Sequence, residues 1–471
     1  MTEPRMKNEY EDLHQSSAGG DATRVLALIG LANDGPMDTF ISAAGLAGAR
    51  SLDTLYGVTS RLSRGAREAI AAAIGLESAI TVYAMRCGAS PVKAYFNLPG
   101  DGEEVFGRLE YQYYGTKGNE LQAKVEIGDS VVVTVKHDDF GTLQISPTTA
   151  DADEWNAKLA AAGIPCTFTV VVGDALGAKD WTAFTGGDNG TITNAEVLRV
   201  LEICEAEKYT NVQVLGVTDA AAHASIGTHC ASQLTDYDCE RFAAIELSSW
   251  DSTAAVNSSP WLVDLETWTT AQEAAHATTS DRNLIGFAGQ QAKFADGAGT
   301  EYYAPIMSAA MGAWLSQPVD QSAVALQVKN VLSLYPEIPP SYRNRLAAAR
   351  LNYLRTEDEL GVIVANDRTL AADTSDYKYM PTLRTQYTCG AEARKAGLPA
   401  WSKPNDPAIN DGLTTLTDFA EKPLEKRKGK TISDYELRAE IDDEGNTVLY
   451  VGIQHKVSMR WITLNVYKKE A

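Results

Sequence analysis

Short apolar runs alternate with helical patterns near the start of the chain. Arg24 to Leu31 is almost continuously apolar and is followed by Asn33 to Pro36, a typical turn sequence. Such a run predicts a strand buried on both faces. Arg61 to Ile74 places Arg and Glu on one side and Ala and Ile on the other, which indicates a helix. Ala79 to Ala84 then reads as a second buried strand, so the order is strand, helix, strand.

The same alternation returns after Gly186. It predicts a helix, a strand, a helix and a strand, at Asn194 to Glu207, Val212 to Val217, Ala220 to Gln233 and Phe242 to Leu247. Strands joined by helix-length crossovers pair in parallel. We therefore expect an α/β multidomain fold with a central mixed or parallel sheet and flanking helices. Two further helices are predicted at Tyr302 to Leu315 and Ser322 to Leu332.

Between these two parts the chain is rich in β-strand patterns. Leu109 to Tyr114, Leu121 to Ile127 and Val131 to Val135 alternate or are β-branched, and glycine-containing turns separate them. This pattern predicts an inserted β-rich domain over residues 92–174. The α/β core domain would then consist of residues 23–91 and 175–358.

Both ends of the chain differ from the core. Residues 1–22 are hydrophilic and include Ser-Ser-Ala-Gly-Gly, which predicts a flexible N-terminal arm. Residues 359–471 are expected to form an α+β C-terminal domain that ends in strands at Asp434 to Ile441, Thr447 to Gln454 and Val457 to Tyr467. Because the last strand is regular and terminal, it could exchange onto the sheet edge of another subunit.

Charge and hydropathy narrow the classes of partner. The 471 residues include 41 Lys and Arg against 62 Asp and Glu, a net charge of −21 that repels phosphate backbones and anionic lipids. We expect no nucleic-acid partner. The apolar run Ala66 to Ala84 is broken by Arg67, Glu68 and Glu77, so no membrane anchor is expected. The polar opening residues do not resemble a secretion signal, which favours folding in a cytoplasm.

Six cysteines are scattered without a C-x-x-C pair, at Cys87, Cys166, Cys204, Cys230, Cys239 and Cys389. This spacing favours buried free thiols over a zinc ribbon or a disulfide framework. Any cysteine on the surface could instead bridge two copies of the chain after oxidation.

The segment Thr185 to Glu196 imitates half of a calcium loop, with Gly190 at its sharp turn. The first two ligand positions hold Thr185 and Gly187, which lack acidic oxygens. We therefore predict a glycine-rich turn before a helix, with Thr193 as N-cap and Glu196 three residues later, as in a capping box. A calcium-binding adhesin-like module built on Asp188 and Glu196 remains an alternative.

Asp219, His223, His229 and Cys230 cluster on one predicted helix, so a hydrolytic or metal site has to be considered. Six residues rotate a helix by about 600°, which puts the two histidines on different faces. The sequence contains no G-x-S-x-G, H-E-x-x-H or G-x-G-x-x-G motif. We assign no catalytic, cofactor-binding or metal-binding residue and expect a non-enzymatic protein. An α/β hydrolase with an unrecognised site is the alternative from another class.

One basic run stands out in this acidic chain, KPLEKRKGK, which contains Lys422, Lys426, Arg427, Lys428 and Lys430. It is either a solvated loop or a docking patch for an acidic protein surface.

Several stretches, read in order, resemble the contractile tail sheath family of bacteriophages and related injection particles. They are Val25 to Pro36, Tyr56-Gly57, Arg64 to Gly88, Tyr114 to Asn119, Phe184 to Gly190, Val212 to His229 and Glu359 to Leu370. The region after Leu370, with Asp373 to Tyr379 and Cys389, departs from the family's pattern.

This resemblance implies a core of subtilisin-like topology without the protease's catalytic residues, and no cofactor. It implies a structural subunit of a virion tail, assembled in the host cytoplasm, that forms six-fold helical rings around a tail tube protein. The N-terminal arm and the C-terminal strand would pair with neighbouring copies. Baseplate and tail terminator proteins would be further partners, and contraction would drive the tube through the host envelope.

Within this family, we expect the cations Lys426, Arg427, Lys428 and Lys430 to face the tube. Exposed ion pairs, at ~0 to 1 kcal/mol each, are weak enough to allow sliding. The sheath of a phage-derived bacterial injection particle is the alternative within the same class.

Overall fold

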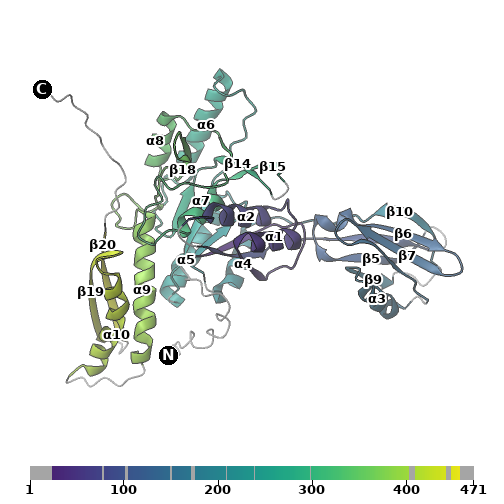
Figure 1. The fold of residues 1–471 in the computed structure, drawn as a ribbon, viewed down its shortest axis with the longest axis horizontal. Helices are drawn as coiled ribbons and strands as arrows, with labels where there is room; N and C mark the ends of the chain where they lie inside the picture. Colours follow the sequence, from purple (N-terminus) through teal and green to yellow (C-terminus); the bar gives the residue numbers. More distant parts are fainter. Residues whose placement is uncertain are drawn as a thin grey trace.

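A computed structural model describes residues 24–76, 79–100, 104–148, 151–170, 176–207, 209–237, 239–296, 299–401, 409–441 and 447–456. The predicted arm at residues 1–22 and the predicted last strand, Val457 to Tyr467, lie outside these residues. An α/β core occupies the middle of the molecule, a β-rich unit extends from one side, and the C-terminal helices and hairpin lie on the other side (Figure 1).

A six-stranded sheet forms the centre of the core. Its strands are β1 (Val25–Gly30), β2 (Phe40–Ala44), β3 (Thr81–Arg86), β11 (Asn211–Val214), β12 (Phe242–Glu246) and β13 (Leu284–Phe287), in the order β13-β12-β11-β1-β3-β2. All neighbours pair in parallel except β2, which is antiparallel to β3. The predicted mixed sheet with parallel pairing is therefore confirmed.

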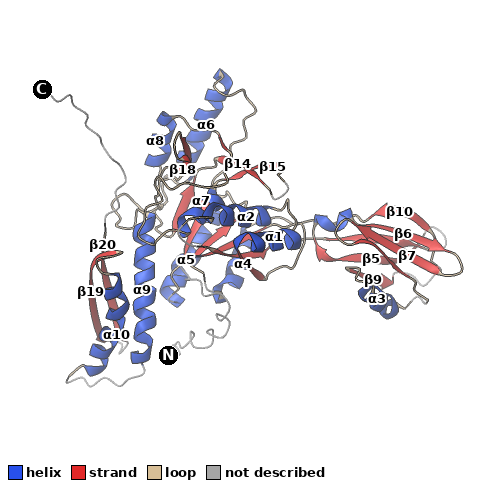
Figure 2. Cartoon of the chain, in the orientation of Figure 1, coloured by secondary structure: helices blue, strands red, loops and turns tan. Residues whose placement is uncertain are grey.

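Helices cover both faces of this sheet (Figure 2). One face carries α1 (Gly45–Tyr56), α2 (Arg61–Ala73) and α7 (Met307–Leu315), and the other carries α4 (Asn194–Ile203), α5 (Ala220–Tyr237) and α6 (Ser259–Ala275). The position of β1 between two hydrophobic cores explains why its sequence is apolar throughout. Leu26 and Leu28 point into the first core, whereas Val25, Ala27 and Ile29 point into the second.

The β-rich unit contains two antiparallel sheets. One consists of β4 (Lys93–Pro99), β5 (Val105–Tyr114) and β9 (Cys166–Val170), and the other of β6 (Gln122–Ile127), β7 (Val131–His137), β8 (Gly141–Ile145) and β10 (Lys179–Ala183). Helix α3 (Ala152–Ala161) supplies Trp155, which stacks on Phe168 with ring centroids 4.2 Å apart. The unit thus has its own hydrophobic core.

In the segment after β13, the structure differs from two of the predicted helices. This segment contains β14 (Gln291–Ala295), β15 (Glu301–Pro305), β16 (Ser333–Tyr335), α8 (Pro340–Ala348), β17 (Leu354–Glu357) and β18 (Gly361–Val364). The helix predicted from Tyr302 begins only at Met307, because Tyr302 and Ala304 are buried while Glu301 and Tyr303 are exposed, which is strand alternation.

The helix predicted at Ser322 to Leu332 is wrong. Ala325 and Asn330 have φ angles of 65° and 61°, which a right-handed helix cannot contain. Instead, the Ala325 and Val328 amides donate to carbonyls of β18, each at 2.9 Å, so this segment runs beside that strand.

The C-terminal unit consists of α9 (Met380–Trp401), α10 (Asp411–Arg427) and the antiparallel hairpin of β19 (Ile432–Ile441) and β20 (Thr447–His455). The strands predicted at Asp434 to Ile441 and Thr447 to Gln454 are confirmed. Helix α9 was not among the predicted elements, and it packs along α10. No helix in the described part of the chain is long and apolar enough to cross a membrane.

Five of the cysteines are buried and Cys239 is partly buried, all as free thiols. Burial raises the pKa of the Cys166 thiol to about 12 and also raises the pKa of the Cys87 thiol. The prediction of buried free thiols is confirmed at Cys87, Cys166, Cys204, Cys230 and Cys389.

Candidate functional site

The candidate hydrolytic residues on α5 each make a structural contact. The His223 ring is buried, with Nδ1 3.1 Å from Nε2 of His276 and Nε2 3.0 Å from the carbonyl oxygen of Val217. The His276 ring in turn has Nδ1 3.1 Å from Oγ1 of Thr279. Two imidazoles that share a hydrogen bond in the interior are stable when both are neutral.

The other three candidates lie in different surroundings. Nε2 of His229 is 3.2 Å from the Arg241 guanidinium, and Cys230 is fully buried with a thiol pKa raised by burial to about 12. Oδ1 of Asp219 accepts hydrogen bonds from the amides of Ala221 and Ala222, both at 3.0 Å, at the start of α5. These residues therefore stabilise the helix and its packing and do not form a nucleophile with its base.

The buried histidine pair predicts acid sensitivity. Burial, with smaller effects of His223 and Arg350, lowers the pKa of His276 to about 4. Burial also lowers the pKa of His223, and the hydrogen bond to Val217 and the charge of Asp219 oppose this shift in part. A histidine with a depressed pKa in the folded state stabilises the fold above its unfolded pKa of about 6.5 and loses that contribution as the pH falls through the folded pKa. At 1.36 kcal/mol per pKa unit, His276 alone lowers the free energy of unfolding by about 3 kcal/mol between pH 7 and pH 4.

Urea unfolding at pH 7.0, 5.5 and 4.5 would measure this loss. The variant His276→Asn is expected to be less stable than the wild type at pH 7 and to lose less stability on acidification. Equal pH slopes for the two proteins would contradict the assignment.

The glycine-rich loop before α4 caps that helix, as predicted. Oγ1 of Thr193 accepts a hydrogen bond from the Glu196 amide at 3.2 Å. The Glu196 carboxylate does not bond back to Thr193 but accepts a hydrogen bond from the Gly88 amide at 2.8 Å. It also pairs with Arg199, and the hydrogen bond from Arg199 lowers the pKa of Glu196. Among the described residues, no group of three or more His, Cys, Asp or Glu could hold a metal ion.

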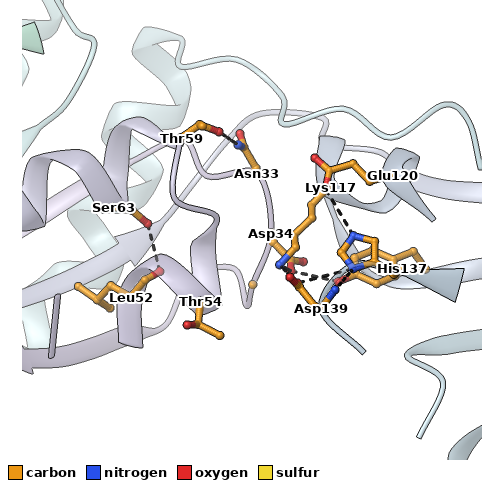
Figure 3. Close-up of polar contacts among 12 residues, drawn as sticks. Asn33, Asp34, Leu52, Thr54, Thr59, Ser63, Lys117, Glu120, His137 and Asp139 are labelled. Carbon is orange, nitrogen blue, oxygen red and sulfur yellow. Dashed lines mark hydrogen bonds and ion pairs between the residues drawn. The ribbon is translucent and has the colours of Figure 1, made fainter. Parts of the chain in front are cut away.

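Several polar contacts lie where the β-rich unit meets the core (Figure 3). Asp34, in the turn after β1, is buried, and burial raises its pKa. Its Oδ2 accepts a hydrogen bond from the Tyr111 hydroxyl at 3.0 Å and lies 3.7 Å from Nζ of Lys117. Lys117 also forms an ion pair with Asp139 and donates its amide to the Asn33 carbonyl at 3.1 Å. The lysine thus joins a core carboxylate to one of the β-rich unit.

This junction continues further into the β-rich unit. Nδ1 of His137 accepts a hydrogen bond from the Asp139 amide at 3.1 Å, and Nε2 lies 3.4 Å from Glu120 (Figure 3). On the core side, Arg86 donates to the carbonyls of Gly35 at 3.1 Å and Tyr114 at 2.7 Å. These bonds and ion pairs favour one orientation of the two units, although Oδ1 of Asp34 and Nη2 of Arg86 make no hydrogen bond within the described residues. The members of the junction are far apart in the sequence, and only the polar turn after a buried strand gave a signal for it.

The basic run at the end of α10 is partly neutralised within the chain. Arg427 makes a two-pronged ion pair with Glu392, at 2.6 and 2.5 Å, and Lys428 lies 2.7 Å from Asp434. Lys422, Lys426 and Lys430 are exposed and have no carboxylate partner among the described residues. Lys422 and Lys426, four residues apart, lie on one side of α10, and Lys430 lies in the turn after it. Three cations of the run are therefore available to another surface.

The hairpin of β19 and β20 is a two-stranded sheet, and within the described chain neither strand pairs with a third. A cavity of about 400 Å³ lies between β20 and the start of α9, and residues such as Gln386, Ile453 and His455 line it. The hairpin therefore offers open backbone edges beside a recess.

No protein-family model and no curated protein matches this chain. Solved structures do, over nearly the full length, and they define a sheath fold. The sheath tail protein of Desulfitobacterium hafniense aligns with a TM-score of 0.64 at 13% identity, covering 93% of this chain and 98% of that protein. A sheath tail protein of Listeria innocua aligns with a TM-score of 0.58 at 13% identity over 94% and 97%.

A subunit of the contracted helical sheath of the anti-feeding prophage covers 100% of both chains, with a TM-score of 0.52 at 12% identity. A contracted sheath subunit of an extracellular contractile injection system aligns with a TM-score of 0.53 at 12% identity over 96% of this chain and 94% of that one. This chain therefore has the fold of contractile sheath proteins, and the resemblance seen in the sequence is confirmed at the level of the fold.

Proposed function

We propose that this chain is the non-enzymatic structural subunit of a contractile tail sheath. The observation that carries the proposal is a fold match spanning 93% of this chain and 98% of a sheath tail protein, which includes the core, the β-rich unit and the C-terminal unit together. In this proposal, the core has the subtilisin-like topology of the family but lacks the catalytic residues of the protease. Six-fold rings stack helically around a tail tube protein, between a baseplate and a tail terminator, in the tail of a phage-like particle.

Strand exchange would link the copies. The open edges of the β19–β20 hairpin support this, because unpaired backbone donors and acceptors are a template for another strand. The candidates are residues 1–22 and Val457 to Tyr467, supplied by neighbouring copies. Such links keep copies connected while rigid cores move from one packing to another, so contraction needs no nucleotide.

Lys426 and Lys430, with Lys422, would contact the tube. Exposed ion pairs contribute ~0 to 1 kcal/mol each, which is weak enough to let the sheath slide along the tube. Arg427 and Lys428 contribute less, since each already has a carboxylate partner.

The sheath of a phage-derived injection particle is the second candidate, and the fold likeness to the anti-feeding prophage and to the extracellular injection system supports it equally. Both candidates predict the same assembly in vitro.

Negative-stain electron microscopy of the purified chain tests the proposal. Hollow six-fold cylinders are expected from the wild type, and monomers from variants lacking residues 1–22 or 457–471. Circular dichroism of each truncated variant would verify that its core is folded. A wild type that stays monomeric at high concentration, with and without a tube, would overturn the proposal.

A further inference from the structure

The two strands of the C-terminal hairpin differ in charge. Strand β19 carries four charged side chains, whereas β20 contains no Lys, Arg, Asp or Glu. The four are Asp434, Glu436, Arg438 and Glu440. Charged side chains on an edge strand oppose pairing with a further strand, and a regular edge without charges favours it. The open edge of β20 is therefore the better acceptor.

The recess of about 400 Å³ in the C-terminal unit lies beside this edge. Residues of β20, of α9 and of the loop before α9 line it, among them Thr382, Gln386 and Asp376. Among the described residues that line it, none belongs to β19. Helix α9 contacts β20 (Figure 1). The recess therefore lies over α9 and next to β20, on the side away from β19.

The inner face of β20 is incompletely covered. Leu449, Val451 and Ile453 pack against the small core of the C-terminal unit, yet each is only partly buried. The Gln386 side-chain amide donates to the Val451 carbonyl at 3.5 Å, which is long for a hydrogen bond. A third strand beside β20 would cover these apolar side chains and offer the edge new backbone donors and acceptors.

We propose that the recess beside β20 receives the segment Val457 to Tyr467 of a neighbouring copy as a third strand. In that strand Ile462, Leu464 and Val466 face α9, because alternate side chains of a strand point to the same side. The inference rests on the proposed sheath function. It names the acceptor edge, the donated segment and the face of the segment that becomes buried.

The two terminal segments differ in how well they suit this recess. The apolar row of Val457 to Tyr467 matches a recess bordered by Val451 and Ile453, whereas residues 1–22 show no such alternation. Residues 457–471 contain three Lys or Arg and one Glu, but residues 1–22 contain two Lys or Arg and five Asp or Glu. In a chain of net charge −21, with Asp376 at the recess, the cationic segment is attracted and the acidic one repelled.

The donor is another copy because the chain has no suitable turn with which to come back. Strand β20 ends at His455, so an antiparallel return would need a tight turn directly after it. Residues 456–460, KVSMR, contain no Gly, Asn, Asp or Pro, the residues that favour such turns. A parallel return would need a crossover of about a dozen residues or more, which would use up the segment itself.

Assembly of the full chain tests the buried face. Leu464→Asp is expected to raise the critical concentration for assembly about tenfold or more, since its carboxylate would enter the apolar recess. Pelleting and electron microscopy would measure this change. Thr463→Asp, on the opposite face of the same strand, is the matched control and should assemble like the wild type. Equal losses in the two variants would overturn the assignment of the face.

Peptide binding tests the acceptor separately from assembly. The acceptor is the full chain carrying Leu464→Asp, whose own segment is disabled, and the probe is a fluorescent peptide of residues 457–471. Saturable binding is expected in fluorescence anisotropy. Adding Thr382→Trp, which fills the recess from α9, should abolish it, whereas Lys395→Trp, at an exposed position of the same helix, should not. Melting temperatures equal to that of the wild type would show that each variant is folded.

The outcomes separate this pairing from the sheath proposal. A folded acceptor that does not bind the peptide, or that binds it equally well with Thr382→Trp, overturns the pairing. Tighter binding of a peptide of residues 1–22 at the same recess also overturns it. In each case a wild type that forms cylinders leaves the sheath proposal standing. A wild type that never assembles overturns the sheath proposal, whatever the peptide does.

Discussion

Replacing Gly312 by alanine is expected to lower the free energy of unfolding by about 3 kcal/mol, the upper end for an overpacked core. Helices α2 and α7 cross at this residue. A Cβ atom on Gly312 would lie 2.1 Å from the carbonyl oxygen of Ala69 and 2.6 Å from its Cα. Because both obstacles are backbone atoms, no side chain can rotate away. Relief requires the two helices to separate, which also opens the core beneath them. Urea unfolding followed by tryptophan fluorescence would measure the loss.

Gly390→Ala is the matched control. Gly390 also lies within a helix, α9, but the nearest atom to its added Cβ is a carboxylate oxygen of Glu240 at 3.7 Å, an ordinary contact. Alanine is the better helix former by up to about 1 kcal/mol, so this variant should be as stable as the wild type or slightly more so. Equal stabilities of the Gly312 and Gly390 variants would show that α2 and α7 tolerate separation.

The elements that the sequence predicted correctly are those whose surroundings are uniform. Strand β1 is buried on both faces, so its run is apolar throughout and needs no knowledge of its partners. Thr193 caps α4 through a contact three residues away, which a local pattern can express. Parallel pairing followed from the length of the crossovers alone.

The elements that it missed depend on contacts distant in the sequence. Ser322 to Leu332 has an apolar content that suits a helix, but its backbone bonds to β18 more than thirty residues later. The junction joins Asp34 to Lys117 and Asp139, and no local pattern contains all three. Glu392 neutralises Arg427 from a neighbouring helix and Asp434 pairs with Lys428, so three of the five cations have no carboxylate partner among the described residues. Tertiary packing decided each of these outcomes.

Arg384→Met is expected to lower the free energy of unfolding by about 3 kcal/mol or more. Arg384 lies in the first part of α9, is 2% exposed, and donates hydrogen bonds to carbonyl oxygens at and just past the end of α7. These are Trp314 at 3.2 Å, Leu315 at 2.9 Å and Gln317 at 2.9 Å. The end of a helix leaves its last carbonyls without internal partners and carries partial negative charge. Methionine would leave the buried carbonyls of Leu315 and Gln317 without this donor, at about 1 to 3 kcal/mol each before relaxation, whereas the Trp314 carbonyl keeps its bond from the Gln317 amide at 3.0 Å.

The position of Arg384 makes its loss a test of how the C-terminal unit is held. Helix α9 leads from the core to the hairpin that we propose for strand exchange, and Arg384 bonds its first part to α7. We therefore expect limited proteolysis of the Arg384→Met variant to release the C-terminal unit before the core unfolds. Arg384→Lys should be intermediate, because an ammonium keeps the charge but cannot span three carbonyls in one plane.

Arg438→Met provides the comparison for Arg384. Its side chain is 61% exposed on β19, forms an ion pair with Glu440 and lies over the Tyr450 ring, 4.4 Å from its centroid. Both are surface contacts, so its loss should change stability by no more than about 1 kcal/mol. If the Arg384 and Arg438 variants proved equally stable and equally resistant to protease, α9 would be held by its apolar contacts alone. In that case, force applied to the hairpin by a neighbouring copy would reach the core through side-chain packing and not through the end of α7.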